Sequence, residues 1–338
     1  MKPTTSIESQ VRANSQVFHQ IRSASRIVVT THRVPDADGL ASCLAFAASV
    51  RQLGKNVAVI TPDAPPRRFR YLDKHEEILA LDSDENAAQL MRSADLVLMF
   101  DSSDTQFGSG IRRILGERKI PVLVVDHHRP RGRVQGLLVE DSSSTGELCY
   151  WMLKELGSPI TQPIAELLYT AISYDTLSFR YVRNNPDTLR CAAALLESGA
   201  DADRVQQRVF QCLTPDSLRF LSRALASAEY LFGARFGLVA ISREATNGLN
   251  IDRDDYRDLI QSLISVESVQ IAAIANFNEE NREIKLSLRS KSGYDVEPIA
   301  RKHGGGGHAQ ACGATIYRMS MERFLETLRT DVGKILNT

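Results

Sequence analysis

Histidine and aspartate side chains recur at the ends of apolar runs in this sequence. Three runs, residues 27–31, 96–100 and 122–125, have the composition of buried strands, and a fourth apolar segment ends at Asp175. The polar residues that follow or end these runs are His32, Asp36, Asp38, Asp101, Asp126, His127, His128 and Asp175. Imidazole and carboxylate ligands together suit Mn, Fe, Co or Zn, whereas Mg and Ca sites are more often made of oxygen alone. The pattern therefore indicates a site for divalent metal ions.

Two ions that share carboxylates can activate a water and stabilise both oxygens of a phosphoryl transfer, and such a pair needs about six ligands. The chain offers that number as His32, Asp36, Asp38, Asp101, His127 and Asp175. Each also has a simpler explanation when taken alone, because an aspartate can cap a helix and a histidine can be held by the backbone. Their joint placement at element ends favours the metal-site interpretation.

The elements that must position these side chains alternate between strands and helices. Besides the three runs above, strands are expected at residues 57–61 and 137–140, and helices at 7–23, 40–53, 86–93, 111–115 and 162–174. This alternation predicts an α/β fold with a mostly parallel sheet and helices on both faces. Since the loops at the carboxyl ends of parallel strands line one crevice, the histidines and aspartates should converge there.

With 338 residues the chain exceeds one typical domain. We expect a first domain with the candidate site over residues 1–205, a helical linker over 206–232 and a smaller α/β domain over 233–338. The smaller domain should contain a strand at 236–242, helices at 256–264, 296–301 and 321–336, and a hairpin of residues 269–277 with 284–289.

Composition limits the partners and the compartment. The 41 basic and 41 acidic residues cancel, so no overall field draws the chain to nucleic acid or to a membrane surface. The five cysteines are scattered and lack Cys-x-x-Cys spacing, which is typical of reduced thiols in a cytoplasmic protein. No signal peptide and no apolar run of about 18 residues is present, so we expect a cytoplasmic protein without a membrane span.

The ordered motifs resemble those of the DHH phosphoesterase superfamily, joined to its C-terminal DHH-associated domain. The motifs are His32-x-x-x-Asp36-x-Asp38, Asp101, Asp126-His127-His128, Asp175 and the run Gly304, Gly305, Gly306, Gly307 and His308. They span nearly the whole chain. Within the superfamily the sequence is most similar to bacterial nano-RNases that also dephosphorylate 3'-phosphoadenosine 5'-phosphate, and more distantly to RecJ-like exonucleases.

The resemblance implies a role for each residue of the cluster. One metal would be held by His32, Asp36, Asp101 and Asp175, and the other by Asp38, Asp101, His127 and Asp175. Asp126 would support a ligand histidine, and His128 would face the scissile phosphate, orienting it or protonating the leaving oxygen. Two Mn²⁺ ions per chain are the expected cofactor, with Mg²⁺ or Co²⁺ as alternatives.

In the C-terminal domain, the glycine run points to an anion-binding site. Consecutive glycines let backbone N–H groups approach an anion, and Arg289 and His308 can donate to phosphate. A flexible linker is the alternative interpretation of Gly304–Gly307, although it leaves His308 unexplained. We expect this segment to grip the phosphate of a terminal nucleotide.

The function implied is a phosphoesterase that degrades short oligoribonucleotides to mononucleotides and dephosphorylates 3'-phosphoadenosine 5'-phosphate. Alternatives are a phosphodiesterase for cyclic or linear di-adenosine nucleotides such as pApA, and a pyrophosphate or polyphosphate hydrolase. A non-catalytic nucleotide-binding module would be marked by lost metal ligands, and none is lost. Substrates are therefore expected to be short oligonucleotides or phosphorylated nucleotides, and a homodimer is one expected oligomeric state.

Two positions depart from the pattern of this family. Leu177 stands where the family commonly has glycine, and Arg129-Pro130-Arg131 follows the Asp-His-His triplet in place of small polar residues. Neither change touches an expected metal ligand. Both are therefore expected to affect substrate preference and rate rather than hydrolysis itself.

Overall fold

The computed structural model describes residues 5–102, 109–130, 132–183, 185–278 and 282–337; Arg131, named above, lies outside them. The chain forms two compact units, Met1–Cys212 and Leu213–Thr338. The sequence-based domain boundaries at 205 and 233 stay a proposal. The second half of the expected linker belongs to the second unit, because Phe220 and Ala224 pack in one of its cores.

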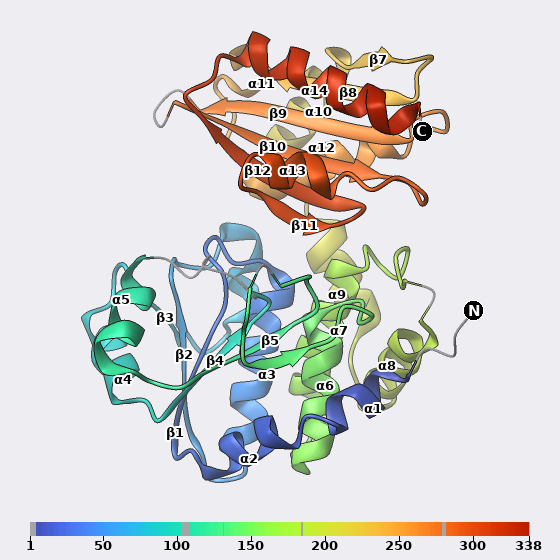
Figure 1. Ribbon diagram of the computed structural model, residues 1–338. Coiled ribbons are helices and arrows are strands. Elements are labelled where there is room, and N and C mark those ends of the chain that lie inside the picture. The colour runs from blue at the N-terminus through green and yellow to red at the C-terminus, as the bar shows by residue number, and fades with distance from the viewer. Residues whose placement is uncertain (1–4, 103–108, 131, 184, 279–281, 338) are drawn as a thin grey trace. The chain divides into compact units, whose positions relative to one another are not determined.

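The first unit is built on a six-stranded sheet whose strands are all parallel (Figure 1). In spatial order the strands are β3 (Ile78–Ala80), β2 (Asn56–Thr61), β1 (Arg26–Thr30), β4 (Leu96–Phe100), β5 (Val122–Asp126) and β6 (Gly136–Leu138). The chain winds outward from β1 to β2 and β3 and then returns to β4 on the other side of β1. The order therefore reverses between β1 and β4, the position at which open α/β sheets bind ligands.

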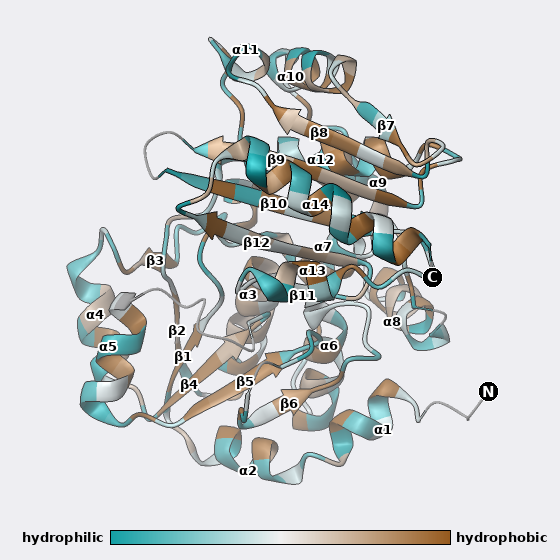
Figure 2. Ribbon diagram, turned by 45° about the horizontal axis from the view of Figure 1, so that its top comes forward, coloured by the Kyte–Doolittle hydropathy of each residue, from teal (hydrophilic) through white to brown (hydrophobic). Residues whose placement is uncertain are grey.

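Helices cover both faces of this sheet, which confirms the predicted fold class. The helices are α1 (Ile7–Arg12), α2 (Ser15–Ser23), α3 (Ala37–Arg51), α4 (Glu85–Ser93), α5 (Ser109–Arg118), α6 (Thr145–Leu156), α7 (Gln162–Asp175), α8 (Pro186–Glu197) and α9 (Ala202–Phe210). Helices α3, α6 and α7 pack on one face, and α4 and α5 on the other. Because both faces are buried, the strands are mainly apolar, and β1, β4 and β5 are largely brown in Figure 2.

Local capping explains where the elements differ from the expected ones. The helix expected over 7–23 is interrupted before Ser15, where Asn14 precedes the start of α2. Helix α3 begins at Ala37 rather than at Leu40, because the Asp36 side chain accepts hydrogen bonds from the backbone N–H groups of Asp38 and Gly39. The connection after β2 also contains a 3-10 helix, η1 (Arg67–Leu72), and strand β3, neither of which was predicted.

The second unit has a mixed six-stranded sheet with helices on both faces. In spatial order its strands are β11 (Gly306–His308), β12 (Ala311–Tyr317), β10 (Glu283–Ser290), β9 (Ile271–Asn278), β8 (Phe236–Ile241) and β7 (Glu229–Leu231). Among the strands that the structure describes in this unit, only β8 and β9 pair in parallel. Its helices are α10 (Pro215–Ala226), α11 (Arg243–Thr246), α12 (Arg253–Ile264), α13 (Glu297–Lys302) and α14 (Met321–Leu336).

The two faces of this second sheet are covered differently. Residues of α13 and α14 pack against β8, β9, β10 and β12 on one face, whereas α10 and α12 cover β8 and β9 on the other. The expected hairpin is present as β9 and β10, while β7, β11 and β12 were not predicted. Within the described residues, no helix is long and apolar enough to cross a membrane.

Candidate metal centre

The strands that flank the reversal of strand order deliver most of the candidate ligands. His32 lies two residues after β1, and Asp101 directly follows β4. Asp126 is the last residue of β5, so His127 and His128 begin the next loop. Since β1, β4 and β5 are neighbouring parallel strands, their carboxyl ends bring these side chains to one edge of the sheet, as predicted.

One group of ligand atoms surrounds His32. Its Nε2 lies 3.7 Å from Oδ1 of Asp36 and 3.6 Å from Oδ2 of Asp101. On the other side of the ring, Nδ1 lies 2.7 Å from the backbone oxygen of Arg33, to which it can donate. That hydrogen bond directs Nε2 towards the two carboxylates, which is the arrangement of a metal-binding histidine.

A second group surrounds His127, whose side chain is fully buried. Its Nε2 lies 3.8 Å from Oδ2 of Asp38, 3.7 Å from Oδ1 of Asp101 and 3.4 Å from Oδ2 of Asp175. Asp175 is the last residue of α7, so the end of a helix, rather than a strand, positions this member of the second group.

Asp101 joins the two groups, because one carboxylate oxygen faces His32 and the other faces His127. The separations of 3.4–3.8 Å exceed those of ordinary hydrogen bonds. Ligand atoms held about 2.1 Å from a common ion lie roughly 3 to 3.4 Å apart, close to the distances seen here. The donor set therefore fits divalent cations, and it does not identify the element.

Charge repulsion within the cluster also favours a cation. Burial, together with the Asp101 and Asp175 carboxylates, raises the pKa of Asp38 well above its usual range. Burial, opposed by the nearby ring of His32, raises the pKa of Asp101 to about 6. Four carboxylates in one largely buried cluster repel one another, and a divalent ion would relieve that repulsion.

The pKa values of His32 and His127 shift in opposite directions, because their charged neighbours differ. For His32, burial favours the neutral ring, but the Asp101 and Asp36 carboxylates outweigh it and raise its pKa to about 10. For His127, burial and the neighbouring His128 lower the pKa to about 4. His127 is therefore neutral at physiological pH, the form in which an imidazole binds a metal.

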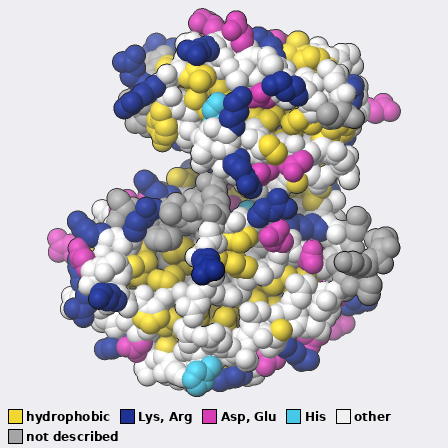
Figure 3. Space-filling view, viewed as in Figure 1, with side chains coloured by type: hydrophobic (Ala, Val, Ile, Leu, Met, Phe, Trp, Pro, Cys, Tyr) yellow, Lys and Arg dark blue, Asp and Glu magenta, His cyan; other side chains and the backbone are white. Residues whose placement is uncertain are grey.

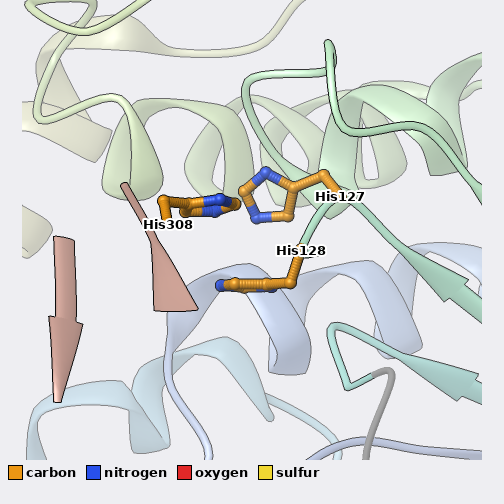
Figure 4. A group of neighbouring side chains, drawn as sticks. All are labelled: His127, His128 and His308. Atoms are coloured by element: carbon orange, nitrogen blue, oxygen red, sulfur yellow. The ribbon is translucent and has the colours of Figure 1, made fainter. Parts of the chain in front are cut away.

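His128 is held by Asp126 at the end of β5. Oδ1 of Asp126 lies 2.8 Å from Nδ1 of His128 and accepts from its backbone N–H at 3.0 Å. Burial favours the neutral ring, but Asp126 outweighs it and raises the pKa of His128 to about 9. Figure 4 shows the rings of His127 and His128 next to each other. Their centroids are 4.5 Å apart. His128 is thus a protonated side chain at neutral pH beside the candidate metal ligands.

The first turn of α6 binds Asp38, a contact that the sequence did not reveal. The backbone N–H groups of Thr145 and Gly146 each donate to the Asp38 carboxylate at 2.8 Å. A helix N-terminus favours an anion, and here the anion is a side chain of the same chain. The side chain of the preceding Ser144 caps the helix by accepting from the backbone N–H of Glu147. A Cβ on Gly146 would lie 2.5 Å from the Cβ of Ala171, so only glycine allows this approach of α6 to α7.

Two further residues behind His127 were also missed. Nδ1 of His127 lies 3.2 Å from the backbone oxygen of Ser142 and 3.3 Å from a guanidinium nitrogen of Arg183. Arg183 is anchored by a hydrogen bond from its other terminal nitrogen to the backbone oxygen of Glu140. Arg183 is an isolated arginine in a polar stretch, so the sequence gives no sign that it contacts His127.

The turn after Asp175 is strained at the position where the family commonly has glycine. Leu177, Ser178 and Phe179 have φ values of 49°, 56° and 65°. Side chains other than glycine disfavour this left-handed region by about 1–2 kcal/mol per residue. Thr176 holds the turn, since its buried hydroxyl accepts from the Phe179 backbone N–H at 2.9 Å.

In the second unit, strand register places Arg289 and His308 in one row. Ala311 of β12 lies opposite Arg289 of β10 on one side and opposite His308 of β11 on the other. Residues directly opposite one another in antiparallel strands point to the same face. Arg289 and His308 therefore share a face with a small residue between them.

Gly306 and Gly307 of the glycine run lie in strand β11, and Gly305 and Gly307 are closely packed, so this part of the run is not a flexible linker. A Cβ on Gly305 would lie 2.1 Å from the backbone oxygen of Gly313, and one on Gly307 would lie 2.5 Å from that of Ala311. Gly306 pairs directly with Gly313. Close packing of β11 on β12 thus requires glycine and leaves the strand short and without bulky side chains next to His308.

A parallel α/β sheet with a joined pair of buried histidine–aspartate groups at its carboxyl edge has the architecture of a metal-dependent phosphoesterase. Residues 26–172 match the DHH family, N-terminal domain, and residues 237–334 match the DHHA1 domain. The chain belongs to the DHH family of phosphoesterases, hydrolases that act on phosphoester bonds.

Relatives of similar length support this assignment. The bifunctional oligoribonuclease and PAP phosphatase NrnA of Thermus thermophilus is 31% identical over 316 residues, which cover 90% of each chain. The protein of the same name from Bacillus subtilis is 24% identical over 94% of this chain and 97% of its own. An exopolyphosphatase-related protein of Bacteroides fragilis has the same fold, with a TM-score of 0.84 at 24% identity over 99% of this chain and 98% of its own.

Proposed function

We propose that this protein is a manganese-dependent phosphoesterase that degrades very short oligoribonucleotides to mononucleotides and dephosphorylates 3'-phosphoadenosine 5'-phosphate. The observation that carries the proposal is the joining of two ligand groups by Asp101, which suits a pair of ions rather than one. The substrate class rests on the two relatives that are oligoribonucleases and PAP phosphatases and that align over nearly the whole chain.

In this proposal the residues of the cluster have separate roles. His32, Asp36, Asp101 and Asp175 would hold one ion, and Asp38, Asp101, His127 and Asp175 would hold the other. Two Mn²⁺ ions in these positions would supply an activated water and would neutralise charge on the phosphate. The backbone N–H groups at the start of α6 fix the Asp38 carboxylate, so that this ligand needs no reorganisation when an ion binds.

His128 acts on the substrate rather than on the ions. Its ring is protonated at neutral pH because Asp126 stabilises the imidazolium. A protonated imidazole can hydrogen-bond a phosphate oxygen and can give a proton to the leaving oxygen. Asp126 would then position His128 and keep it charged.

In this proposal, residues of the second unit bind the phosphate of a terminal nucleotide. Arg289 and His308 lie in one row of the sheet, and Gly306 and Gly307 place no side chains beside them. Charge is otherwise spread out: on the face shown in Figure 3, Lys and Arg side chains are interspersed with Asp and Glu rather than gathered into one long basic groove. A local phosphate site, with no long basic groove on the face shown, favours short substrates.

A substrate panel on one Mn²⁺-loaded preparation tests the proposal. A labelled RNA dinucleotide and 3'-phosphoadenosine 5'-phosphate should be turned over faster than cyclic di-adenosine nucleotides, pyrophosphate or polyphosphate. A faster rate on pyrophosphate or polyphosphate would replace the proposed substrate class. No turnover of any of these, with less than about one ion bound per chain, would indicate a non-catalytic module.

A further inference from the structure

Asp63 lies just after β2, beside the loop that carries His32 and Asp36. Strand β2 pairs in parallel with β1, so both strands end at the edge of the sheet where the candidate ligands lie. The backbone oxygen of Asp63 accepts a hydrogen bond of 2.8 Å from the buried hydroxyl of Thr61, the last residue of β2. Asp63 is thus fixed to the end of the strand, although it belongs to neither group of candidate ligands.

The Asp63 carboxylate binds this loop at two points. Oδ2 accepts from the backbone N–H of Val34 at 2.7 Å, and Oδ1 accepts from the guanidinium of Arg33 at 3.3 Å. The backbone oxygen of Arg33 in turn lies 2.7 Å from Nδ1 of His32. A carboxylate is a stronger acceptor than a neutral oxygen, so these contacts hold the loop firmly.

The turn between His32 and Asp36 has an unfavourable backbone conformation at Val34, with φ of 49°. A β-branched residue is an outlier in the left-handed region, and the proline that follows, Pro35, favours an extended conformation before it. The Val34 side chain is exposed, so its burial contributes little to stabilising the turn. The turn nevertheless brings Oδ1 of Asp36 to 3.7 Å from Nε2 of His32. The hydrogen bond to Asp63 stabilises the conformation on which this approach depends.

We propose that Asp63 is a positioning residue for the ion held by His32 and Asp36, which it keeps close together by stabilising the strained turn between them. Asp63 itself would touch neither the ion nor the substrate. Without its hydrogen bond, the backbone of Val34 should relax towards an extended conformation, and Asp36 should move away from His32. The inference rests on the metal centre of the proposed function and not on the identity of the substrate.

Asp95 offers a matched control at the opposite end of β1. Its carboxylate accepts from the backbone N–H of Arg26 at 2.9 Å and from the guanidinium of the same residue at 2.7 Å. Arg26 is the first residue of β1, whereas the candidate ligands follow the last. Asp63 and Asp95 therefore make the same kinds of hydrogen bond to the two ends of one strand, and their side chains are 23% and 35% exposed.

Titration of the metal-free protein with Mn²⁺ tests the proposal, with urea unfolding as the measure of stability. Asp63→Ala should weaken the binding of one of the two ions about tenfold, as expected when a residue that supports a ligand is removed. Asp63→Asn keeps an oxygen for the Val34 N–H and should lose less. Asp95→Ala should lose stability but bind both ions as the wild type does. Unchanged Mn²⁺ affinity in Asp63→Ala, or an equal loss of affinity in Asp95→Ala, would overturn the inference.

A second substitution separates the effect of the turn from a general loss of structure. Glycine adopts the left-handed backbone without strain. Val34→Gly in the Asp63→Ala background should therefore regain part of the lost Mn²⁺ affinity, whereas in the Asp95→Ala background it should leave the affinity unchanged. No recovery in the Asp63→Ala background would show that Asp63 does not act through the turn, and would also overturn the inference.

The proposed function is tested separately by hydrolysis with the wild type. A wild type that binds two Mn²⁺ ions but hydrolyses neither an RNA dinucleotide nor 3'-phosphoadenosine 5'-phosphate would contradict the proposed function. The order of Mn²⁺ affinities among the variants would still decide the role of Asp63. A wild type that binds no Mn²⁺ would overturn both.

Discussion

The backbone N–H of Gly146 donates a hydrogen bond of 2.8 Å to Oδ1 of Asp38, which ties the start of α6 to a proposed metal ligand in the first turn of α3. A second bond of the same length comes from Thr145. The metal centre thus depends on how closely α6 approaches α7 and α3. Residues that no ion touches should therefore control metal binding.

Gly146→Ala tests that dependence. The added methyl group would lie 2.5 Å from the Cβ of Ala171, so the helices must separate. We expect a loss of about 1–3 kcal/mol in the free energy of unfolding, as for other overpacked sites, together with weaker Mn²⁺ binding. Urea unfolding and Mn²⁺ titration measure the two effects.

Gly116→Ala is the matched control, since a Cβ at this exposed position of α5 meets nothing within 4 Å. It should gain up to about 1 kcal/mol from reduced backbone entropy of the unfolded chain. Equal changes in the free energy of unfolding and in Mn²⁺ binding for the two substitutions would show that the packing of α6 does not require glycine at position 146.

The pair of Asp126 and His128 makes a prediction about pH. Asp126 raises the pKa of His128 to about 9 from about 6.5, so the charged ring is present below that value and is lost as pH rises through it. In Asp126→Asn the alkaline limb of the kcat profile should move to lower pH, towards the ordinary histidine pKa. His128→Gln should lose this limb altogether. An alkaline limb that stays in place in Asp126→Asn would exclude His128 as the proton donor.

Metal uptake should release protons. The pKa values of Asp38 and Asp101 are raised in the metal-free protein, and that of His32 is about 10, so these groups hold protons that an ion must displace. Mn²⁺ affinity should therefore increase as pH rises from about 6 to about 8.

Titration calorimetry in buffers of different ionisation enthalpy counts the protons released. The exposed Asp82→Asn variant should release as many as the wild type. An affinity that does not depend on pH, with no proton release, would mean that ions do not bind at this cluster.

The turn after Asp175 gives a prediction about stability. Leu177 has φ of 49°, which glycine adopts without strain. Leu177→Gly should change the free energy of unfolding by less than about 0.5 kcal/mol, because relief of strain offsets the greater entropy of the unfolded chain. Leu189→Gly, on the exposed face of α8, should lose about 1 kcal/mol. A larger loss at Leu177 than at Leu189 would show that the turn is not strained in solution.

The sequence was sufficient to predict that the candidate ligands at the ends of strands lie close together. Apolar runs mark β1, β4 and β5, and parallel strands must end at a common edge, so the positions of His32, Asp101 and His127 in the chain already predict that they lie together. Their neighbours in the cluster, Asp36 and Asp38, follow from their proximity to His32 in the chain.

The contacts that came from tertiary packing could not be predicted in this way. Whether Gly146 meets Asp38 depends on the register between α3 and α6, and no local pattern encodes that register. Arg183 reaches His127 through a left-handed backbone, which the sequence does not announce at a non-glycine residue. Short strands such as β7 and β11 form only because a neighbouring strand offers them hydrogen-bonding partners.

The claim that Asp101 joins two ion sites is tested most directly by Mn²⁺ stoichiometry. Asp101→Asn keeps the size of the side chain and removes the charge that faces both His32 and His127. The wild type should bind two Mn²⁺ ions per chain, and Asp101→Asn should bind fewer than one at the same ion concentration, with Asp82→Asn as the control that still binds two. A wild type that binds only one ion, or an Asp101→Asn variant that still binds two, would contradict the account.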